Sequence, residues 1–346
     1  MAAEPAPASG RPPRALILGC AGERLETDER DFFAAADPLG FILFRRNCRE
    51  PGQVRDLVAA LRDSVGRFDA PVLIDQEGGR VARLQPPHWR RYPAPARIAA
   101  LPDPLAEEAA WLGARLIADD LAALGITLDC LPVLDLPAAG ADAVIGDRAY
   151  GSAPQRVIRL GRAVCEGLLD GGILPIVKHT PGHGRARVDS HFALPVVSAP
   201  RAELSLGDFA PFRALALMPW AMTAHIVYAA IDAAAPATLS RRVVGEIIRG
   251  EIGFAGVLVS DDLSMQALGG GIGERAEQAL AAGCDLVLHC NGQRQEMEET
   301  ALAARPLAPA AAARLQRGEA MRRPPSPFER DAAEARFDLL LAGGRA

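Results

Sequence analysis

The sequence predicts an α/β protein with a single domain, a closed (β/α)8 barrel of the TIM type. Three observations support this fold. The chain has 346 residues, a length that single α/β barrels commonly reach. Eight short β-branched or apolar runs alternate with longer segments of helical character, which implies parallel strands joined by right-handed crossovers. Reactive side chains also follow several of these runs, as they do at the mouth of a barrel.

The strand candidates are short runs rich in Val, Ile and Leu. In chain order they cover residues 15–20, 40–44, 72–75, 128–134, 174–178, 221–225, 257–260 and 286–289. Eight such units favour closure into a barrel, and a doubly wound open sheet is the structural alternative.

The helices expected between these strands show apolar side chains at helical spacing. In segment 53–65, Val54, Leu57, Val58 and Leu61 share one helical face. Segments of similar character are 107–124, 155–169, 241–252 and 274–282.

These elements predict three parts of the chain. Residues 1–14 are rich in Ala and Pro and are expected to form a disordered N-terminal extension. Residues 15–310 are expected to form the barrel, and residues 311–346 a C-terminal helical or irregular tail. The sequence shows no internal repeat and nothing that resembles a second domain.

Composition excludes several classes of partner. The formal net charge is −5, whereas nucleic acids and anionic membranes recruit basic patches. No segment approaches the roughly 18 uninterrupted apolar residues of a transmembrane helix. We therefore expect no nucleic-acid or membrane partner. A monomer is expected, although the sequence does not fix the oligomeric state.

The cysteines bear on cellular location. They form no CxxC pair, which is typical of reduced, buried thiols in a cytoplasmic protein. Residues 17–20, Ile-Leu-Gly-Cys, look like a lipoprotein cleavage site. The apolar stretch before Cys20 is far shorter than the about 7–15 residues of a signal peptide. A cytoplasmic location is therefore predicted.

The first reactive cluster is residues 74–83, Ile-Asp-Gln-Glu-Gly-Gly-Arg-Val-Ala-Arg, after the third strand candidate. Carboxylates at a strand end can accept paired hydrogen bonds from hydroxyl groups, and arginine side chains can donate to sugar oxygens. By itself, this cluster fits a solvated loop with a salt bridge equally well.

The second cluster contains three of the six histidines within residues 178–191. A metal site is the obvious alternative, because imidazoles and a carboxylate are metal ligands. However, Lys178 beside His179 would repel a cation, and the spacing is not that of a helical metal motif. In Asp189-Ser190-His191, the carboxylate can orient the imidazole and raise its basicity, which makes a proton shuttle near neutral pH. A structural histidine at a loop tip is the simpler interpretation.

The third cluster ends an apolar strand with two adjacent carboxylates, Asp261 and Asp262. Adjacent side chains of a strand point to opposite faces, so one acid can face the barrel axis while the other binds nearby groups. A helix N-cap role for Asp262 or Ser264 is the structural alternative. Asp261 and His191 could together hydrolyse a glycosidic bond if both face the mouth.

These clusters, in this order, resemble the single-barrel bacterial β-N-acetylglucosaminidases of glycoside hydrolase family 3 that act in peptidoglycan recycling. The resemblance covers residues 16–291. It rests on five motifs: 40–47 (GFILFRRN), 75–83, 144–150 (VIGDRAY), 178–194 and 261–265 (DDLSM). Thr180 departs from the family pattern, which more often has Phe there.

The resemblance implies a role for each matched residue. Asp261 would be the nucleophile that forms a covalent glycosyl-enzyme intermediate, and His191, paired with Asp189, the acid/base. The residues implied to hold the terminal N-acetylglucosamine (GlcNAc) are Asp75, Arg83, Arg148, Lys178 and His179. The implied substrate is a muropeptide in which GlcNAc is β-1,4-linked to 1,6-anhydro-N-acetylmuramic acid, and no metal or organic cofactor is implied.

Other functions remain open from the sequence. A broader β-glycosidase or a GlcNAc phosphorylase would use the same barrel, because a neutral His191 would not repel phosphate as a carboxylate would. A metal-dependent amidohydrolase would require a ligand set that the spacing does not favour. A sugar-binding protein without catalysis would be expected to lack the nucleophile or the acid/base.

Overall fold

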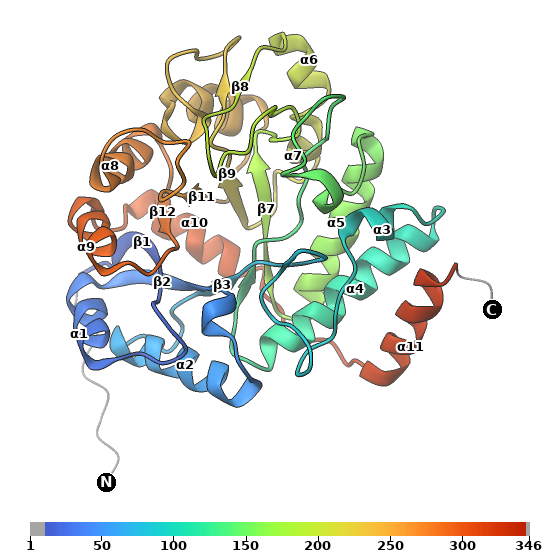
Figure 1. Cartoon of the computed structure of the whole chain (residues 1–346), viewed down its shortest axis with the longest axis horizontal. Coiled ribbons are helices and arrows are strands. Elements are labelled where there is room, and N and C mark those ends of the chain that lie inside the picture. Colours follow the sequence, from blue (N-terminus) through green and yellow to red (C-terminus); the bar gives the residue numbers. More distant parts are fainter. Residues whose placement is uncertain (1–10, 344–346) are drawn as a thin grey trace.

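The computed structural model describes residues 11–343, which form a closed barrel of eight parallel strands surrounded by helices (Figure 1). The barrel strands are β1 (Arg14–Gly19), β2 (Pro38–Leu43), β3 (Val72–Ile74), β6 (Leu128–Asp129), β7 (Leu174–Thr180), β9 (Trp220–Thr223), β11 (Val257–Asp262) and β12 (Leu286–His289). The first and last strands pair directly, with Leu16 opposite Val287, so this sheet has no open edge. The predicted (β/α)8 fold is confirmed, and the open-sheet alternative is wrong.

Each predicted strand coincides with a barrel strand. The strands could be predicted because parallel strands that are covered on both faces are almost continuously apolar. The largest difference is at β6, which is two residues long although residues 128–134 were expected. Pro132 has no amide hydrogen to donate to a neighbouring strand. Beyond it, pairing with β7 is reduced to one bridge between Val133 and Lys178.

The helices lie outside the barrel and cover its strands (Figure 1). The segments predicted as helical correspond to α2 (Pro51–Ser64), α4 (Leu105–Ala122), α5 (Pro154–Asp170), a π-helix (Val243–Glu251) and α8 (Ile272–Ala282). The side chains expected on one face of α2 are all buried. Further helices are α1 (Thr27–Ala36), α3 (Pro95–Ala99), α6 (Arg201–Leu206), α7 (Ala210–Ala214), α9 (Arg294–Ala303), α10 (Pro309–Glu319) and α11 (Arg330–Leu341).

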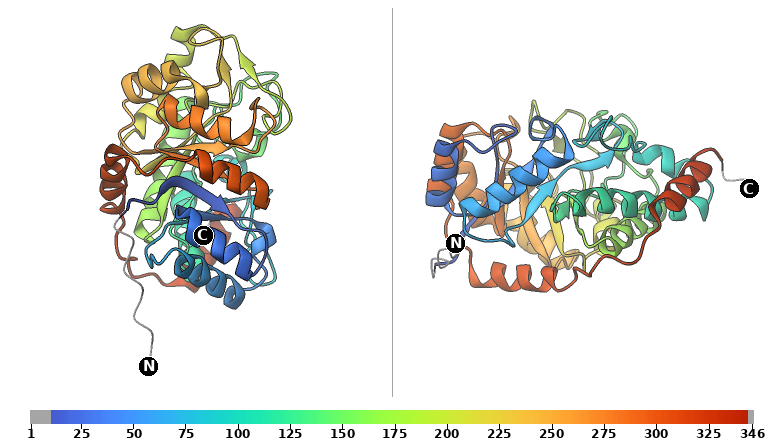
Figure 2. Two further views of the ribbon diagram at one scale, coloured as in Figure 1. Left: turned by 90° about the vertical axis from the view of Figure 1, so that its left-hand side faces the viewer. Right: turned by 90° about the horizontal axis from the view of Figure 1, so that it is seen from below.

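The C-terminal region contributes two helices. α10 lies across the end of the barrel where the strands begin, with Gly318 against Pro219 at the start of β9 (Figure 2). α11 packs on α4 through Phe337 and Leu340, which are fully buried. Residues 1–10 and 344–346 lie outside the described residues, so most of the predicted N-terminal extension does too.

Short strands extend beyond the end of the barrel where the parallel strands finish, which is opposite to the end that α10 covers. β4 (Gln76–Gly78) and β5 (Val81–Ala82) form a hairpin directly after β3. β8 (Val196–Val197) pairs with β10 (Val227–Tyr228) in a second small sheet. Both small sheets follow the carboxyl ends of barrel strands. Within residues 11–343, no helix combines the length and apolarity needed to cross a membrane.

Candidate active site

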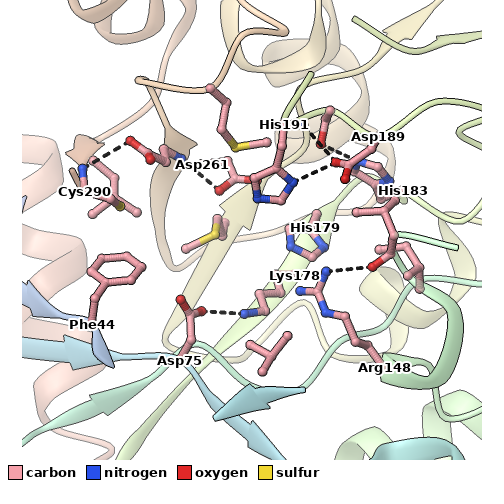
Figure 3. A pocket seen from close by; sticks show the side chains of 18 of the residues that line it. Phe44, Asp75, Arg148, Lys178, His179, His183, Asp189, His191, Asp261 and Cys290 are labelled. Carbon is pink, nitrogen blue, oxygen red and sulfur yellow. Dashed lines mark hydrogen bonds and ion pairs between the residues drawn. The ribbon is translucent and has the colours of Figure 1, made fainter. Parts of the chain in front are cut away.

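The residues singled out from the sequence lie around one cavity of about 300 Å³ at the barrel mouth (Figure 3). All eight line it: Asp75, Arg83, Arg148, Lys178, His179, Asp189, His191 and Asp261. They come from segments far apart in the chain, because the carboxyl ends of the parallel strands converge at the same rim. The cavity therefore brings together the three reactive clusters.

A network of buried charges forms one side of this cavity. Lys178, only 1% exposed, donates from Nζ to Asp75 Oδ1 at 2.8 Å and forms an ion pair with Glu77 Oε1 at 2.6 Å. Arg83 donates to Asp75 Oδ2 at 2.8 Å. Arg148 donates to both oxygens of Glu77, at 2.8 and 2.9 Å. Two carboxylates are thus held by three cations, and each side chain is bonded to at least one partner.

The network keeps its charges at neutral pH. Burial would raise the pKa of Asp75, but the ammonium of Lys178 and the guanidinium of Arg83 hold this pKa well below its usual range. Burial also opposes ionisation of Glu77, yet Lys178 and Arg148 lower its pKa to about 2. Burial would lower the pKa of Lys178, and the two carboxylates raise it instead. Such fixed charges can orient sugar hydroxyls, because they act in a site with little water.

His179 is oriented by a buried carboxylate. Asp135 Oδ2 accepts a hydrogen bond from His179 Nδ1 at 2.7 Å, and Asp135 Oδ1 accepts one from the His183 amide at 2.6 Å. Burial would raise the pKa of Asp135, but the imidazole of His179 lowers it, so the side chain is a carboxylate. Because a carboxylate only accepts, Nδ1 of His179 carries the hydrogen, and Nε2 is left for the cavity.

The two adjacent acids of the third cluster have different surroundings. Asp261 lines the cavity, and its Oδ1 accepts a hydrogen bond from the Asp262 amide at 2.8 Å. Asp262 Oδ1 accepts from the amides of Ser264 at 3.0 Å and Cys290 at 3.1 Å, and its Oδ2 accepts from the Ser264 hydroxyl at 2.7 Å. Asp262 therefore closes a turn and does not cap a helix. The helix-cap interpretation of Asp262 is wrong.

Asp261 is an ionised carboxylate at neutral pH. Burial would raise its pKa, but the positive charge that His225 gains only in acid, the imidazole of His179, the Asp262 amide and the ammonium of Lys178 together hold the pKa below its usual range. An ionised carboxylate at the end of a barrel strand, facing a cavity, is able to attack an electrophilic carbon.

Asp189 and His191 lie on the loop between β7 and β8. His191 Nδ1 is 2.7 Å from Asp189 Oδ1, which also accepts the His191 amide at 2.9 Å. Burial opposes ionisation of Asp189, but the amide and imidazole of His191 lower its pKa. The carboxylate accepts from Nδ1, so Nε2 is the nitrogen available for proton transfer. Figure 3 shows the His191 ring between Asp189 and Asp261 in this view.

The loop is anchored mainly at Ser190. The hydroxyl of Ser190 is buried and lies 3.0 Å from His183 Nε2. Burial lowers the pKa of His183 to about 4, so this imidazole is neutral. In contrast, the His191 side chain is 58% exposed and the Phe192 residue 73% exposed. Ser190, which lies between Asp189 and His191, is therefore held in place, while the His191 imidazole stays accessible.

Several residues around the site received no role from the sequence. Glu77 belongs to the first cluster, but nothing in the pattern showed that Arg148, 71 residues away, would bind it. Asp135 directly follows the strand candidate 128–134, and this position is the sequence feature that could have identified it. His225 ends the strand candidate 221–225, which was the corresponding signal, whereas the role of His183 is recognisable only from its neighbours. In residues 11–343, no group of three or more His, Cys, Asp or Glu side chains is arranged to hold a metal ion.

Comparison with known proteins gives a consistent result. The family model described as the glycosyl hydrolase family 3 N-terminal domain matches residues 20–317. A β-hexosaminidase of Alkalilimnicola ehrlichii is 41% identical over 287 residues, which are 80% of each chain. A β-hexosaminidase of Pseudomonas aeruginosa is 41% identical over 294 residues, 84% of this chain and 85% of the other.

Solved structures show the same similarity. NagZ from Neisseria gonorrhoeae superposes with a TM-score of 0.83 at 35% identity, over 96% of this chain and 97% of that one. The same values hold for its complex with N-trifluoroacetyl-D-glucosamine.

Proposed function

The chain belongs to glycoside hydrolase family 3, and we propose that it is a retaining exo-β-N-acetylglucosaminidase that acts on peptidoglycan fragments. The proposed substrate is a muropeptide in which a terminal GlcNAc is β-1,4-linked to 1,6-anhydro-N-acetylmuramic acid. Support for the activity comes from relatives named β-hexosaminidase at 41% identity. Support for the sugar comes from a similar enzyme, at 35% identity, that binds an N-acylated glucosamine.

In the first proposed step, the Asp261 carboxylate attacks the anomeric carbon of GlcNAc. The bond from that carbon to the glycosidic oxygen breaks, and His191 Nε2 donates a proton to the departing oxygen. The product is a covalent ester between GlcNAc and Asp261. Asp189 accepts from Nδ1 at 2.7 Å, which orients the ring and stabilises the charged imidazolium from which the proton leaves.

In the second proposed step, the roles of the imidazole reverse. His191 Nε2 takes a proton from water, and the water oxygen attacks the anomeric carbon from the face that the leaving group vacated. The ester bond breaks, and Asp261 is restored as a carboxylate. Two displacements on opposite faces release GlcNAc with the β configuration that it had in the substrate.

The buried charges are proposed to bind the terminal sugar. Asp75 can accept hydrogen bonds from two neighbouring hydroxyls, while Lys178, Arg83, Arg148 and His179 donate to or accept from the remaining polar groups. Because the network is formed before substrate binds, little reorganisation is needed during the reaction. A cavity of about 300 Å³ accommodates one sugar residue, in keeping with removal of a single terminal unit.

One observation carries the proposal. Asp261 and the Asp189–His191 pair line the same cavity as the charged network, although they follow different strands. A nucleophile, a proton shuttle and a binding surface for hydroxyls are the three parts that a retaining glycosidase needs. The cytoplasmic location predicted from the sequence belongs to the same proposal, and the six free cysteines support it.

The test uses purified protein and GlcNAc-β-1,4-linked 1,6-anhydro-N-acetylmuramic acid, with and without its peptide. We expect release of free GlcNAc, detected first by proton NMR as the β anomer. The reaction is repeated with and without phosphate, because a phosphorylase would form GlcNAc 1-phosphate only when phosphate is present. A β-glucoside without the N-acetyl group is the control for a broader β-glycosidase. First appearance of the α anomer, or equal rates on the glucoside, would contradict the proposal.

A further inference from the structure

Three buried side chains behind the nucleophile belong to none of the sequence clusters. Thr223 ends β9, His225 follows two residues later, and Thr238 lies in the 3₁₀ turn Ala237–Leu239. All three have 0% exposure. They do not line the cavity, so a direct role toward substrate is excluded and their contacts must be explained from within the protein.

Their hydrogen bonds run from the backbone on one side of the nucleophile to the backbone on the other. The Asp261 amide donates to Thr223 Oγ1 at 3.3 Å, and Thr223 Oγ1 lies 2.8 Å from Thr238 Oγ1. Thr238 Oγ1 lies 2.8 Å from His225 Nδ1. His225 Nε2 lies 3.0 Å from the Asp262 carbonyl oxygen. Together with the chain itself, these contacts close a ring.

Which group donates and which accepts in each hydrogen bond of the ring follows from its two backbone groups, the Asp261 amide and the Asp262 carbonyl. A carbonyl oxygen only accepts, so His225 Nε2 carries a hydrogen and donates to Asp262. Burial lowers the pKa of His225, which makes the imidazole neutral and leaves Nδ1 as an acceptor. Thr238 Oγ1 also lies 3.1 Å from the Ala224 carbonyl oxygen. We assign its single hydrogen to Nδ1 of His225, which is nearer at 2.8 Å and would otherwise have no donor, and the Thr223 hydroxyl then donates to Thr238. Thr223 accepts the Asp261 amide, so each group donates once in the same sense around the ring.

We propose that Thr223, Thr238 and His225 are positioning residues for the nucleophile. The ring holds the amide before the Asp261 side chain and the carbonyl after Asp262. Between these two points, the Asp262 amide donates to Asp261 Oδ1 at 2.8 Å. With one carboxylate oxygen held in this way, Oδ2 is the oxygen presented to the anomeric carbon. This inference rests on the proposed function of Asp261.

The side chain of Asp262 adds contacts that lie outside the ring. The Asp262 carboxylate is bound on the other side by Ser264 and by the Cys290 amide on the end of β12. The peptide units around Asp261 are therefore held from β9 through the ring and from β12 through Asp262. Hydrogen bonds in such a closed chain strengthen one another in a dry interior, so the attack angle depends on every member.

Removal of one hydroxyl opens the ring with little change of shape. Thr238→Val takes away the donor to His225, the acceptor for Thr223 and the contact with the Ala224 carbonyl oxygen, and Thr238→Ser is the matched control because it keeps the hydroxyl. With 4-nitrophenyl N-acetyl-β-glucosaminide, we expect kcat of the Val variant to fall about 10- to 100-fold, since small misplacements of a reacting group have effects of this size. KM and inhibition by GlcNAc should stay near wild type, because the sugar-binding residues do not contact the ring.

Clear outcomes would overturn the proposal. A folded Thr238→Val protein with wild-type kcat, or a Thr238→Ser protein as slow as the Val variant, would show that the ring does not position Asp261. Circular dichroism establishes whether each variant is folded. If Thr238→Val does not fold, Thr223→Val opens the ring at its first bond, with Thr223→Ser as its control and the same expectation.

A second measurement does not depend on activity. Nitrogen NMR of the imidazoles, with His225 assigned from its loss in His225→Gln, should show a neutral ring with the hydrogen on Nε2. A protonated His225 at neutral pH, or hydrogen on Nδ1, would overturn the ring even in an enzyme that hydrolyses GlcNAc as proposed. A wild-type protein without hydrolase activity would instead overturn the proposed function. The spectrum would still show which nitrogen of His225 carries the hydrogen, and so which groups donate in the ring.

Discussion

Two regions of the same cavity are built in opposite ways. In the charged network, the side chains of Glu77, Lys178 and Asp75 are 0%, 2% and 14% exposed, and Lys178 contacts both carboxylates. The Asp189–His191 pair lies on a loop, and the His191 side chain is 58% exposed. The network is connected through several elements of the barrel, whereas the imidazole is held by one neighbour in its own loop.

The difference corresponds to what each region would do in the proposed reaction. Groups that recognise a sugar act best when they are fixed in advance and shielded from water. A proton shuttle must meet a leaving group and then a water molecule at the same place, so it has to remain accessible. We infer that substitutions in the network affect stability and binding together, while substitutions in the loop affect chemistry with little effect on stability. The predictions below test this division.

The largest effect is expected for Asp261→Asn, which keeps the size of the side chain and removes the nucleophile. By analogy with other covalent nucleophiles, kcat should fall by about four orders of magnitude or more. GlcNAc should still bind nearly as well as to wild type, as measured by calorimetry, because the network is intact. Turnover by this variant at a rate close to wild type would remove Asp261 from the mechanism.

His191→Ala should separate chemistry from binding. We expect hydrolysis of the disaccharide substrate to slow by about 10²- to 10⁴-fold, the range of general acid catalysis. Hydrolysis of the 4-nitrophenyl glycoside should lose much less in its first step, because 4-nitrophenolate leaves without a proton. Rates are compared for a series of aryl leaving groups of different acidity. An equal loss for all of them would mean that His191 binds substrate and does not protonate it.

Lys178→Met tests the stability of the buried network. Removal of the cation leaves two carboxylates with reduced compensation, and breaking a buried ion pair typically costs about 3–5 kcal/mol of unfolding free energy. The matched variant in the other region is Asp189→Asn, for which we expect a change of about 0.5 kcal/mol or less. Urea unfolding measures both. Similar values for the two variants would contradict the contrast between the regions.

The smallest expected effect is on how Tm changes with pH in acid. The pKa of Glu77 is about 2 in the folded protein, compared with about 4.3 in an unfolded chain. A lowered pKa contributes stability above the unfolded value, and this contribution is lost as pH falls toward the folded value. Thermal unfolding should therefore show a decline in Tm from about pH 4.3 downward, and the decline should be less steep in Glu77→Gln. A Glu77→Gln protein with the wild-type slope would show that Glu77 is not held ionised.

Much of this organisation was predictable from the chain. The eight apolar runs predicted the barrel strands, because a strand covered on both faces leaves a continuous apolar signature. Residues at the carboxyl ends of those runs had to meet at one rim, which selects Asp75, Lys178 and Asp261. Arg148 lies outside the three reactive clusters and was selected only through the family resemblance. The shortness of β6 was missed, although Pro132 stands within the predicted segment. Asp261 and Asp262 could not be distinguished from spacing alone, and their hydrogen bonds distinguish them in the fold.

The sequence by itself thus determined the architecture and the reactive side chains at the strand ends, since periodicity and strand ends are local properties of the chain. Only the tertiary structure decided which groups pair. The bond between Arg148 and Glu77 spans 71 residues, and that between Lys178 and Asp75 spans 103. Protonation and direction of the Thr223–Thr238–His225 ring depend on burial and on carbonyl positions. Such properties arise from neighbours in space, which no local pattern of residues encodes.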